Sequence, residues 1–237
     1  MDLVRNSNVA QQLTAWAETI FQTIADTRTK FAGILDDCVL ESGQFRVSSP
    51  ARKRLAQVAR QHVAECSQTD GVGLIFQRQL VVPESPALEW WIREGDQLRR
   101  QGFVNDPSSP LFYDYEQLEW FRGGFGAEAR TLAGPYIDHF GVQDYITTWT
   151  IPLVIKNRTV GVVGLDLKVD ALEKVLVPKL LKASNGRAAL VNETGQVIVS
   201  TIGPFSSGTL VETAPSGYAF HPLQVENLRL TLLVEAG

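Results

Sequence analysis

A proline-free stretch near the start of the chain constrains the fold most. Between about residues 9 and 38, apolar side chains recur at spacings of three, four and seven: Val9, Leu13, Trp16, Ile20, Ile24, Phe31, Ile34, Leu35 and Cys38. This spacing predicts one amphipathic helix with a single apolar stripe. At 1.5 Å per residue the helix would be about 45 Å long, longer than a domain of this size needs for its own core. We therefore expect part of the stripe to face a second copy of the chain in a homodimer.

A second helix is predicted at about residues 50–67. Gly43 interrupts the first helical pattern, and Ser49-Pro50 offers a capping residue followed by proline at the first helical position. Apolar side chains then return at helical spacing: Leu55, Val58, Ala59, His62, Val63 and Cys66. The two helices make up an N-terminal unit, residues 1–68.

From Gly71 onward the pattern is that of strands. The segments are rich in valine, isoleucine and aromatic residues: 71–76, 87–94, 134–138, 144–155 and 159–167. A short turn between the last two predicts an antiparallel hairpin. Further strands are predicted after Gly186, at 187–193, 196–201, 209–213, 218–225 and 228–236. The class is therefore α+β, with long helices first and antiparallel sheet after them, divided into modules at 69–184 and 185–237.

Two capping boxes predict short helices beside these strands. Asp114 and Gln117 would open the first helix, which a glycine-rich run ends. Asp170 and Glu173 would open the second, and Pro178 would kink or restart it near its end.

Composition excludes several functions. The 22 basic and 26 acidic residues give a net charge of −4 without blocks of like sign, so neither a nucleic-acid partner nor a basic membrane patch is expected. Cys38 and Cys66 are too few for a disulfide framework or a zinc site. No apolar run is long enough to cross a membrane, and no secretory signal is present, so we expect a cytoplasmic protein.

Catalytic signatures are mostly absent from the sequence, and the histidines show no metal-ligand spacing. The glycine-rich segments lack the strand and helix context of nucleotide-binding loops. His62, His139 and His221 lie in three separate elements without metal-ligand spacing, and His62 on its apolar stripe is predicted to be a packed core residue. We therefore expect no metal, no cofactor and no enzymatic activity.

Aromatic and acidic residues are concentrated between residues 90 and 149. The aromatic residues are Trp90, Trp91, Tyr113, Tyr115, Trp120, Phe121, Tyr136, Tyr145 and Trp149. For any one of them a place in the core is the favoured interpretation. However, Tyr136 and Asp138 share a strand face, and Asp166 interrupts a buried strand, where a carboxylate must be hydrogen-bonded, paired or bound. Two carboxylates in an aromatic cleft suit a cation.

These residues carry a family resemblance. The segments YDYEQLEWF (113–121), GPYID (134–138) and ITTWTIPLVIKNRTVGVVGLDLKVDAL (146–172) resemble the Cache family of ligand-sensing domains, which have a PAS-like fold and serve bacterial chemoreceptors and sensor kinases. The resemblance covers most of residues 8–180. Residues 187–237 are similar to the start of the second, smaller module of a double Cache domain. Most relatives lie outside the cytoplasm between membrane spans, a feature that this sequence does not show.

The resemblance also implies a ligand site. In amino-acid-binding relatives, the residues at the positions of Trp120, Tyr136, Asp138 and Asp166 surround the ligand's ammonium group. We add Tyr113, Phe121 and Trp149 from the same aromatic cluster as candidate ligand-binding residues. The cation that holds the ligand carboxylate in those relatives is replaced here by Leu118. Arg122, one turn further on, is an alternative cation, but it projects at a different angle, and we expect it to be a surface residue or to cap the last helical carbonyls.

The function expected from the sequence is that of a cytoplasmic, non-enzymatic sensor. It would bind a small amine-bearing molecule and report its presence to an unknown partner protein or to a second subunit. One alternative is an enzyme that acts on a small amine, with Asp138 or Asp166 as general base. Another alternative is an interaction domain with no ligand.

Overall fold

The computed structural model describes residues 2–104, 106–138 and 144–236. Its helices are α1 (Asp2–Leu35), α2 (Ser49–Glu65), α3 (Glu119–Phe121) and α4 (Val169–Leu180). Its strands are β1 (Thr69–Phe76), β2 (Leu88–Glu94), β3 (Gln97–Gln101), β4 (Thr131–Ile137), β5 (Tyr145–Ile155), β6 (Arg158–Lys168), β7 (Ala188–Val191), β8 (Val197–Ser200), β9 (Tyr218–Pro222) and β10 (Thr231–Glu235). Long helices followed by antiparallel sheets confirm the predicted α+β class.

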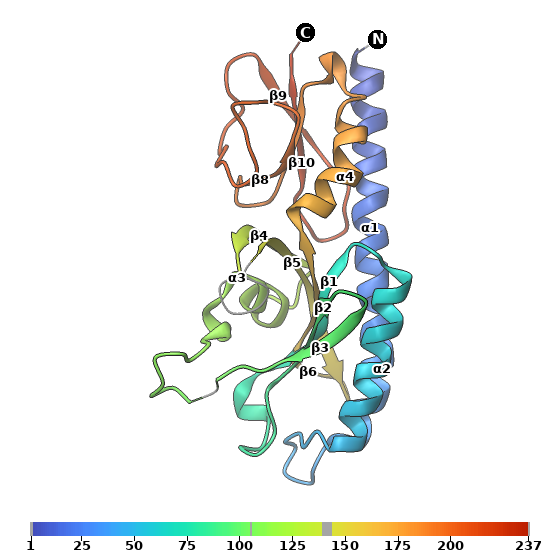
Figure 1. Ribbon diagram of the computed structural model, residues 1–237. Coiled ribbons are helices and arrows are strands. Elements are labelled where there is room, and N and C mark those ends of the chain that lie inside the picture. The colour runs from blue at the N-terminus through green and yellow to red at the C-terminus, as the bar shows by residue number, and fades with distance from the viewer. Residues whose placement is uncertain (1, 105, 139–143, 237) are drawn as a thin grey trace.

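A six-stranded antiparallel sheet forms the larger layer, with strand order β3-β2-β1-β6-β5-β4 (Figure 1). Helices α1 and α2 cover one face, and α3 lies on the other (Figure 1). Glu89 of β2 is fully buried and accepts a 2.8 Å hydrogen bond from Arg52, which ties α2 to the sheet. Strand β3 is not predicted from the sequence, because its residues QLRRQ are polar and lie at the edge of the sheet.

Helix α1 is longer than predicted and runs beside both sheets (Figure 1). Its 34 residues correspond to about 51 Å, and Asp36–Cys38 add one 3-10 turn. Most apolar side chains of its stripe are buried within the same chain: Val9, Leu13, Ala17, Ile20, Phe21, Ile24, Phe31 and Leu35. Trp16 and Ile34 are half-buried against the same core. The argument for a homodimer from an uncovered stripe is therefore wrong, and the oligomeric state stays a prediction.

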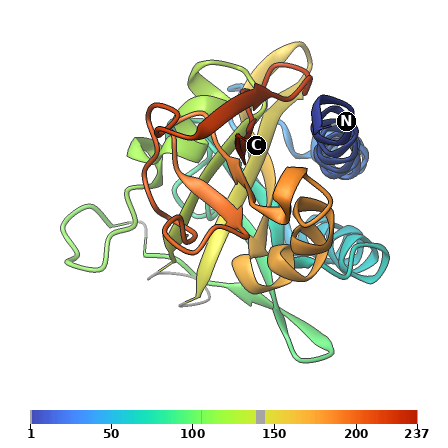
Figure 2. The same cartoon turned by 90° about the horizontal axis from the view of Figure 1, so that it is seen from above.

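The smaller sheet has four antiparallel strands in the order β8-β7-β10-β9. Seen from above, it lies beside α4, with α1 and α2 next to one another (Figure 2). The predicted strand 209–213 is wrong: this segment contributes a single bridge, from Leu210 to Gln196, between turns. Its residues TLVET have the composition of a strand, but they make only isolated backbone bonds: the Thr209 carbonyl accepts from Val197 at the start of β8, and the Val211 amide donates to Gly195 in the β7–β8 turn.

The helix starts differ from the predicted capping boxes. Ser48, not Ser49, caps α2 and accepts a hydrogen bond from the amide of Ala51. Asp114 caps no helix, because its carboxylate binds Arg78 at 2.9 Å, and only a 3-10 turn precedes α3. The glycine-rich run does not end this helix but continues it as a π-helical turn, Arg122–Gly126.

Helix α4 also departs from its predicted start and end. It begins at Val169, without a side-chain cap, and Asp170 pairs with Lys174 instead. Pro178 does not restart the helix: Val169–Leu180 is one continuous element, and Pro178, two residues before its end, only removes the amide that would bond to the Lys174 carbonyl. None of the described helices is both long and apolar enough to cross a lipid bilayer.

Candidate ligand-binding site

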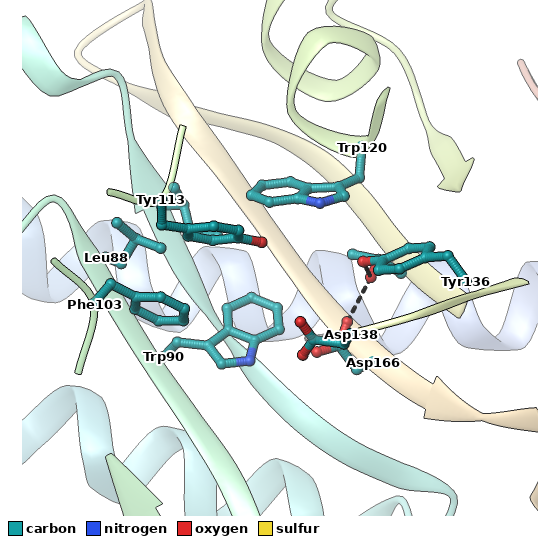
Figure 3. Close-up of a pocket in the computed structure, with 10 residues that line it drawn as sticks. Leu88, Trp90, Phe103, Tyr113, Trp120, Tyr136, Asp138 and Asp166 are labelled. Carbon is teal, nitrogen blue, oxygen red and sulfur yellow. Dashed lines mark hydrogen bonds between the residues drawn. The ribbon is translucent and has the colours of Figure 1, made fainter. Parts of the chain in front are cut away.

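One cavity lies on the α3 face of the six-stranded sheet (Figure 3). Aromatic, aliphatic, hydroxyl and carboxylate side chains line it: Ile75, Leu88, Trp90, Phe103, Tyr113, Trp120, Tyr136, Asp138, Thr148 and Asp166. Its volume is about 30 Å³, whereas one water molecule needs about 10–15 Å³ on the same measure. As it stands, the cavity is narrow, and a ligand with more than a few atoms requires the walls to move apart.

Asp166 lies on the floor of the cavity, in the middle of the sheet. Its neighbours across the strands are Thr148 on β5 and Gly71 on β1. The Thr148 hydroxyl donates a 2.7 Å hydrogen bond to Asp166 Oδ1. A Cβ atom at Gly71 would lie 2.9 Å from both Asp166 Oδ2 and Trp90 Nε1. Gly71 therefore leaves the space in which the carboxylate and the indole meet.

The pKa of Asp166 is raised to about 8, mainly by burial. The charges of Asp138 and Asp70 contribute to this rise, while hydrogen bonds from Thr148 and Trp90 act in the opposite direction. Asp166 is 5% exposed, so water cannot stabilise its negative charge. A cation that enters the cavity would replace this missing solvation and favour the ionised carboxylate.

Tyr136 completes a chain of hydroxyl groups that ends at Asp166. Its hydroxyl oxygen lies 2.5 Å from Thr148 Oγ1. The Thr148 proton points to the Asp166 carboxylate, so Tyr136 is the donor to Thr148. Burial and the nearby Asp166 charge raise the pKa of Tyr136, which keeps it protonated as this donor.

Aromatic rings form the walls. Trp120 lies on α3, and its backbone carbonyl accepts a 2.8 Å hydrogen bond from the Thr150 hydroxyl of β5. Phe103 and Tyr113 stack with ring centroids 5.0 Å apart and close the opposite side (Figure 3). Trp90 rises from β2 beside the two carboxylates (Figure 3). The cavity is therefore acidic at one end and aromatic at the other.

The structure brings together five of the seven predicted site residues, namely Tyr113, Trp120, Tyr136, Asp138 and Asp166. The other two predicted residues, Phe121 and Trp149, do not line the cavity. Phe121 turns away from the cavity and packs on Tyr115 and Phe125, each with centroids 5.2 Å away, because neighbouring helical residues point about 100° apart.

Trp149 lies on the opposite face of the sheet from the cavity. Its ring packs on Trp16 and Phe21 of α1, with centroids 5.5 and 5.2 Å away. Its neighbour Thr148 lines the cavity, as the alternation of strand side chains requires.

The sequence does not predict the other five lining residues, Ile75, Leu88, Trp90, Phe103 and Thr148. Trp90 belongs to the aromatic cluster, but the pattern gives no sign which member of the Trp90-Trp91 pair faces the cavity. A signal exists in β1: a Cβ at Gly73 would lie 2.9 Å from the Trp90 ring, so two glycines in β1 make room for this side chain. Phe103 follows the unpredicted strand β3.

Leu118 and Arg122, the two positions considered for binding a ligand carboxylate, do not line the cavity. Leu118 is half-buried against the hydrophobic core, and Arg122 is exposed, as expected. Among the residues that the structure describes, no Lys, Arg or His lines the cavity. His139 lies outside the described residues.

His62 is a packed core residue, as predicted. It is 4% exposed, and its ring nitrogens lie 2.8 Å from Thr27 Oγ1 and 3.1 Å from Thr69 Oγ1. Burial lowers its pKa to about 4, so the ring is neutral. Over the described parts of the chain, no group of three or more His, Cys, Asp or Glu is placed to hold a metal ion.

Comparisons with known proteins agree with this architecture. Residues 57–174 match the family model described as methyl-accepting chemotaxis protein-like, first PDC sensor domain. Among solved structures, a methyl-accepting chemotaxis protein X matches with a TM-score of 0.65 at 14% identity, over 99% of this chain and 97% of that one.

Two further structures are ligand-binding domains of Pseudomonas chemoreceptors. The P. fluorescens chemoreceptor CtaA in complex with L-serine has a TM-score of 0.62 at 17% identity, over 97% of this chain and 93% of that one. The P. aeruginosa amino acid chemoreceptor PctC in complex with GABA has a TM-score of 0.59 at 15% identity, over 98% and 97%. The fold, with its long leading helix and two antiparallel sheets, is thus that of chemoreceptor sensor domains. The match over residues 57–174 supports a PDC-type, Cache-like sensor module in this part of the chain.

Proposed function

We propose that this chain is the ligand-binding part of a non-enzymatic sensor of the double Cache type, and that its ligand is a small molecule with a protonated amine. The observation that carries this proposal is the pair of carboxylates, Asp138 and Asp166, side by side in one aromatic cavity (Figure 3). Carboxylates attract an ammonium group by charge, and the faces of aromatic rings attract it further.

The second part of the proposal concerns the rest of the ligand. GABA and L-serine, bound by two structurally similar domains, each carry an ammonium group and a carboxylate. Here Leu118 and Arg122 are outside the cavity lining, and no cation among the described residues faces the cavity. Burial of a carboxylate without a partner is costly. The preferred ligand is therefore an amine without an α-carboxylate, such as an aliphatic diamine or a quaternary ammonium compound.

A thermal-shift screen tests this preference. The panel contains 1,4-diaminobutane, choline, L-serine and GABA, each with the wild type and with Asp138→Asn. We expect 1,4-diaminobutane or choline to raise the Tm most, and Asp138→Asn to abolish that rise. L-serine as the strongest stabiliser of the wild type would contradict the proposed ligand class.

The alternative function is an enzyme that acts on a small amine. The raised pKa of Asp166 is the observation that favours it, because a general base works best with a pKa near the operating pH. Incubation of the best-binding amine with the protein, followed by mass spectrometry of the amine, separates the two functions. Recovery of unchanged ligand supports the sensor, and turnover that is lost in Asp166→Asn supports the enzyme.

The sensor proposal leaves the signalling route as a prediction. We infer that ligand occupancy is passed to a partner protein or a second subunit. The homodimer and the cytoplasmic location expected from the sequence stay predictions as well.

A further inference from the structure

Asn192 of the smaller sheet makes a buried contact with the strand that carries Tyr136. It follows β7 and is only 4% exposed. Its Nδ2 donates a 2.7 Å hydrogen bond to the backbone carbonyl of Gly134 in β4. The two residues are 58 positions apart in the chain, so this bond joins the two sheets directly.

Gly134 sits in an irregularity of β4 that shapes the cavity wall. The pairing with β5 shifts between Ala133 and Tyr136, so Gly134 and Pro135 have no partner in the regular ladder. A Cβ atom at Gly134 would lie 2.8 Å from Tyr136 Cδ1, and the φ of +93° is one that other residues rarely adopt. The backbone of Gly134 thus packs against the Tyr136 ring. A displacement of the Gly134 carbonyl would therefore also displace Tyr136, which lines the cavity.

The other end of the contact is held by a tight turn. Asn192 Oδ1 accepts hydrogen bonds from the Thr194 amide at 3.0 Å, the Thr194 hydroxyl at 2.9 Å and the Gln196 amide at 2.8 Å. These bonds form an Asx turn between β7 and β8. The Asn192 amide is thereby oriented, with its oxygen on the turn and its nitrogen on the cavity strand.

We propose that Asn192 is a positioning residue that couples the ligand cavity to the smaller sheet, by holding the segment before Tyr136 in place. The ligand-dependent half of this proposal rests on the proposed function. A ligand that displaces Tyr136 moves the Gly134 carbonyl, and Asn192 carries that movement to the β7–β8 turn. In the reverse direction, the turn fixes the wall against which the ligand binds.

Two other contacts of the smaller module lie away from the cavity lining. Asn6 of α1 accepts a 3.0 Å hydrogen bond from the Ser184 amide, and Arg130 binds Glu18 at 2.7 Å and Glu226 at 3.1 Å. These contacts attach the smaller sheet to α1. The Asn192 bond differs because its acceptor lies two residues from a lining side chain.

The test uses variants that separate the cross-sheet bond from the turn. Asn192→Ser keeps a side-chain acceptor for the turn but is too short to reach Gly134. Asn192→Asp keeps the acceptor oxygen and loses the amide donor, and it serves as the second variant if the serine protein does not fold. Thr194→Val is the matched control, because it removes one bond of the turn and leaves the Asn192 donor in place.

The first measurement is amide hydrogen exchange in the ligand-free protein. We expect residues 131–137 to exchange about tenfold faster in Asn192→Ser or Asn192→Asp than in the wild type, as the loss of one buried hydrogen bond implies. Thr194→Val should leave this segment unchanged. Equal exchange of residues 131–137 in all four proteins, or equal acceleration by Thr194→Val, would overturn the positioning role.

The second measurement adds 1,4-diaminobutane. In the wild type we expect slower exchange in residues 188–200 as well as in β4, and in the Asn192 variants slower exchange in β4 alone, with affinity reduced about tenfold. Protection of 188–200 that persists in both variants would overturn the coupling. If the wild type does not bind 1,4-diaminobutane, the proposed ligand class is wrong, and the ligand-free exchange still decides the role of Asn192.

Discussion

At the scale of single residues, burial of Asp166 raises the pKa of its carboxyl group and makes its ionisation depend on a nearby cation. Asp166 shares the cavity with Asp138 and keeps one hydroxyl donor, Thr148, at 2.7 Å. Its environment raises its pKa to about 8, with burial as the main cause, so the empty cavity does not hold two full negative charges at neutral pH. A cationic ligand would lower the pKa of Asp166 and favour its ionised form. The same carboxylate therefore links ligand binding to pH.

The first prediction concerns Asp138. Asp138→Asn should weaken binding of 1,4-diaminobutane by about 2–3 kcal/mol, the range of a charge-assisted hydrogen bond to a ligand. Asp138 is half-buried at the end of β4, so its removal should leave the Tm of the empty protein nearly unchanged. Calorimetric titration and thermal unfolding measure the two quantities. Normal binding, or loss of the fold, would show that Asp138 is a structural residue.

The second prediction concerns the pH dependence of stability. The pKa of Asp166 is raised in the folded protein to about 8 from an ordinary value of 3.8. Its protonated form is therefore favoured by folding, and its contribution to the free energy of unfolding is fully present below about pH 4 and lost as pH rises towards 8. Urea unfolding from pH 4 to 9 should show this decline in the wild type and a weaker one in Asp166→Asn.

Ligand binding should show the opposite pH trend. A cation favours ionised Asp166, so the affinity for 1,4-diaminobutane should rise between pH 5 and 8 in the wild type and stay flatter in Asp166→Asn. An affinity that is independent of pH in both proteins, together with lower stability of Asp166→Asn at every pH, would assign Asp166 a purely structural role.

At the scale of elements, Lys168 joins three segments near the site. Its Nζ lies 3.2 Å from Asp70 Oδ1 of β1 and 3.0 Å from Asp144 Oδ2 just before β5. The Asp144 carbonyl accepts a 3.0 Å hydrogen bond from the Asp138 amide. The end of β6 thus positions the end of β4, where the ligand-selecting carboxylate lies.

The third prediction is that Lys168→Met lowers the free energy of unfolding by about 1–3 kcal/mol, because Asp70 is buried and would lose its cation. It should also weaken amine binding through Asp138. Lys174→Met is the control, because Lys174 is exposed and pairs only within α4. Denaturant unfolding and calorimetry measure both effects. An equal effect of the two substitutions would contradict this role.

The elements also show what sequence periodicity can and cannot predict. The helical stripe of α1 follows from burial on one face, and the continuous β-branched and apolar runs of β5 and β6 follow from burial in the middle of a sheet, so their patterns predict them. The polar edge strand β3 carries no such pattern. The cavity needs β1, β2, β4, β5 and β6 in register, and pairing between strands far apart in the chain is not encoded in local spacing. For this reason the sequence does not predict Trp90 and Thr148 as lining residues. It also does not show that Trp149 lies on the α1 face of the sheet, away from the cavity.

At the scale of the whole molecule, α1 holds the two sheets in one body. Its buried stripe packs along the larger sheet, and its contacts with Ser184 and with Glu226 bind the smaller module. The buried stripe of α1 is therefore a shared part of both cores.

The fourth prediction follows from this shared helix. Urea unfolding should be a single transition with the same midpoint by circular dichroism and by tryptophan fluorescence, because all five tryptophans lie in α1 or with the larger sheet, whereas circular dichroism reports on both. Two separate midpoints would show that the smaller sheet unfolds independently of α1.

The most direct test of the proposed ligand class is a calorimetric comparison of two ligands of similar length and opposite charge, 1,4-diaminobutane and succinate, with the wild-type protein at pH 8. Asp138 and Asp166 with their aromatic walls predict measurable binding of 1,4-diaminobutane and none of succinate. Binding of succinate as tight as or tighter than that of 1,4-diaminobutane would contradict an amine-selective cavity.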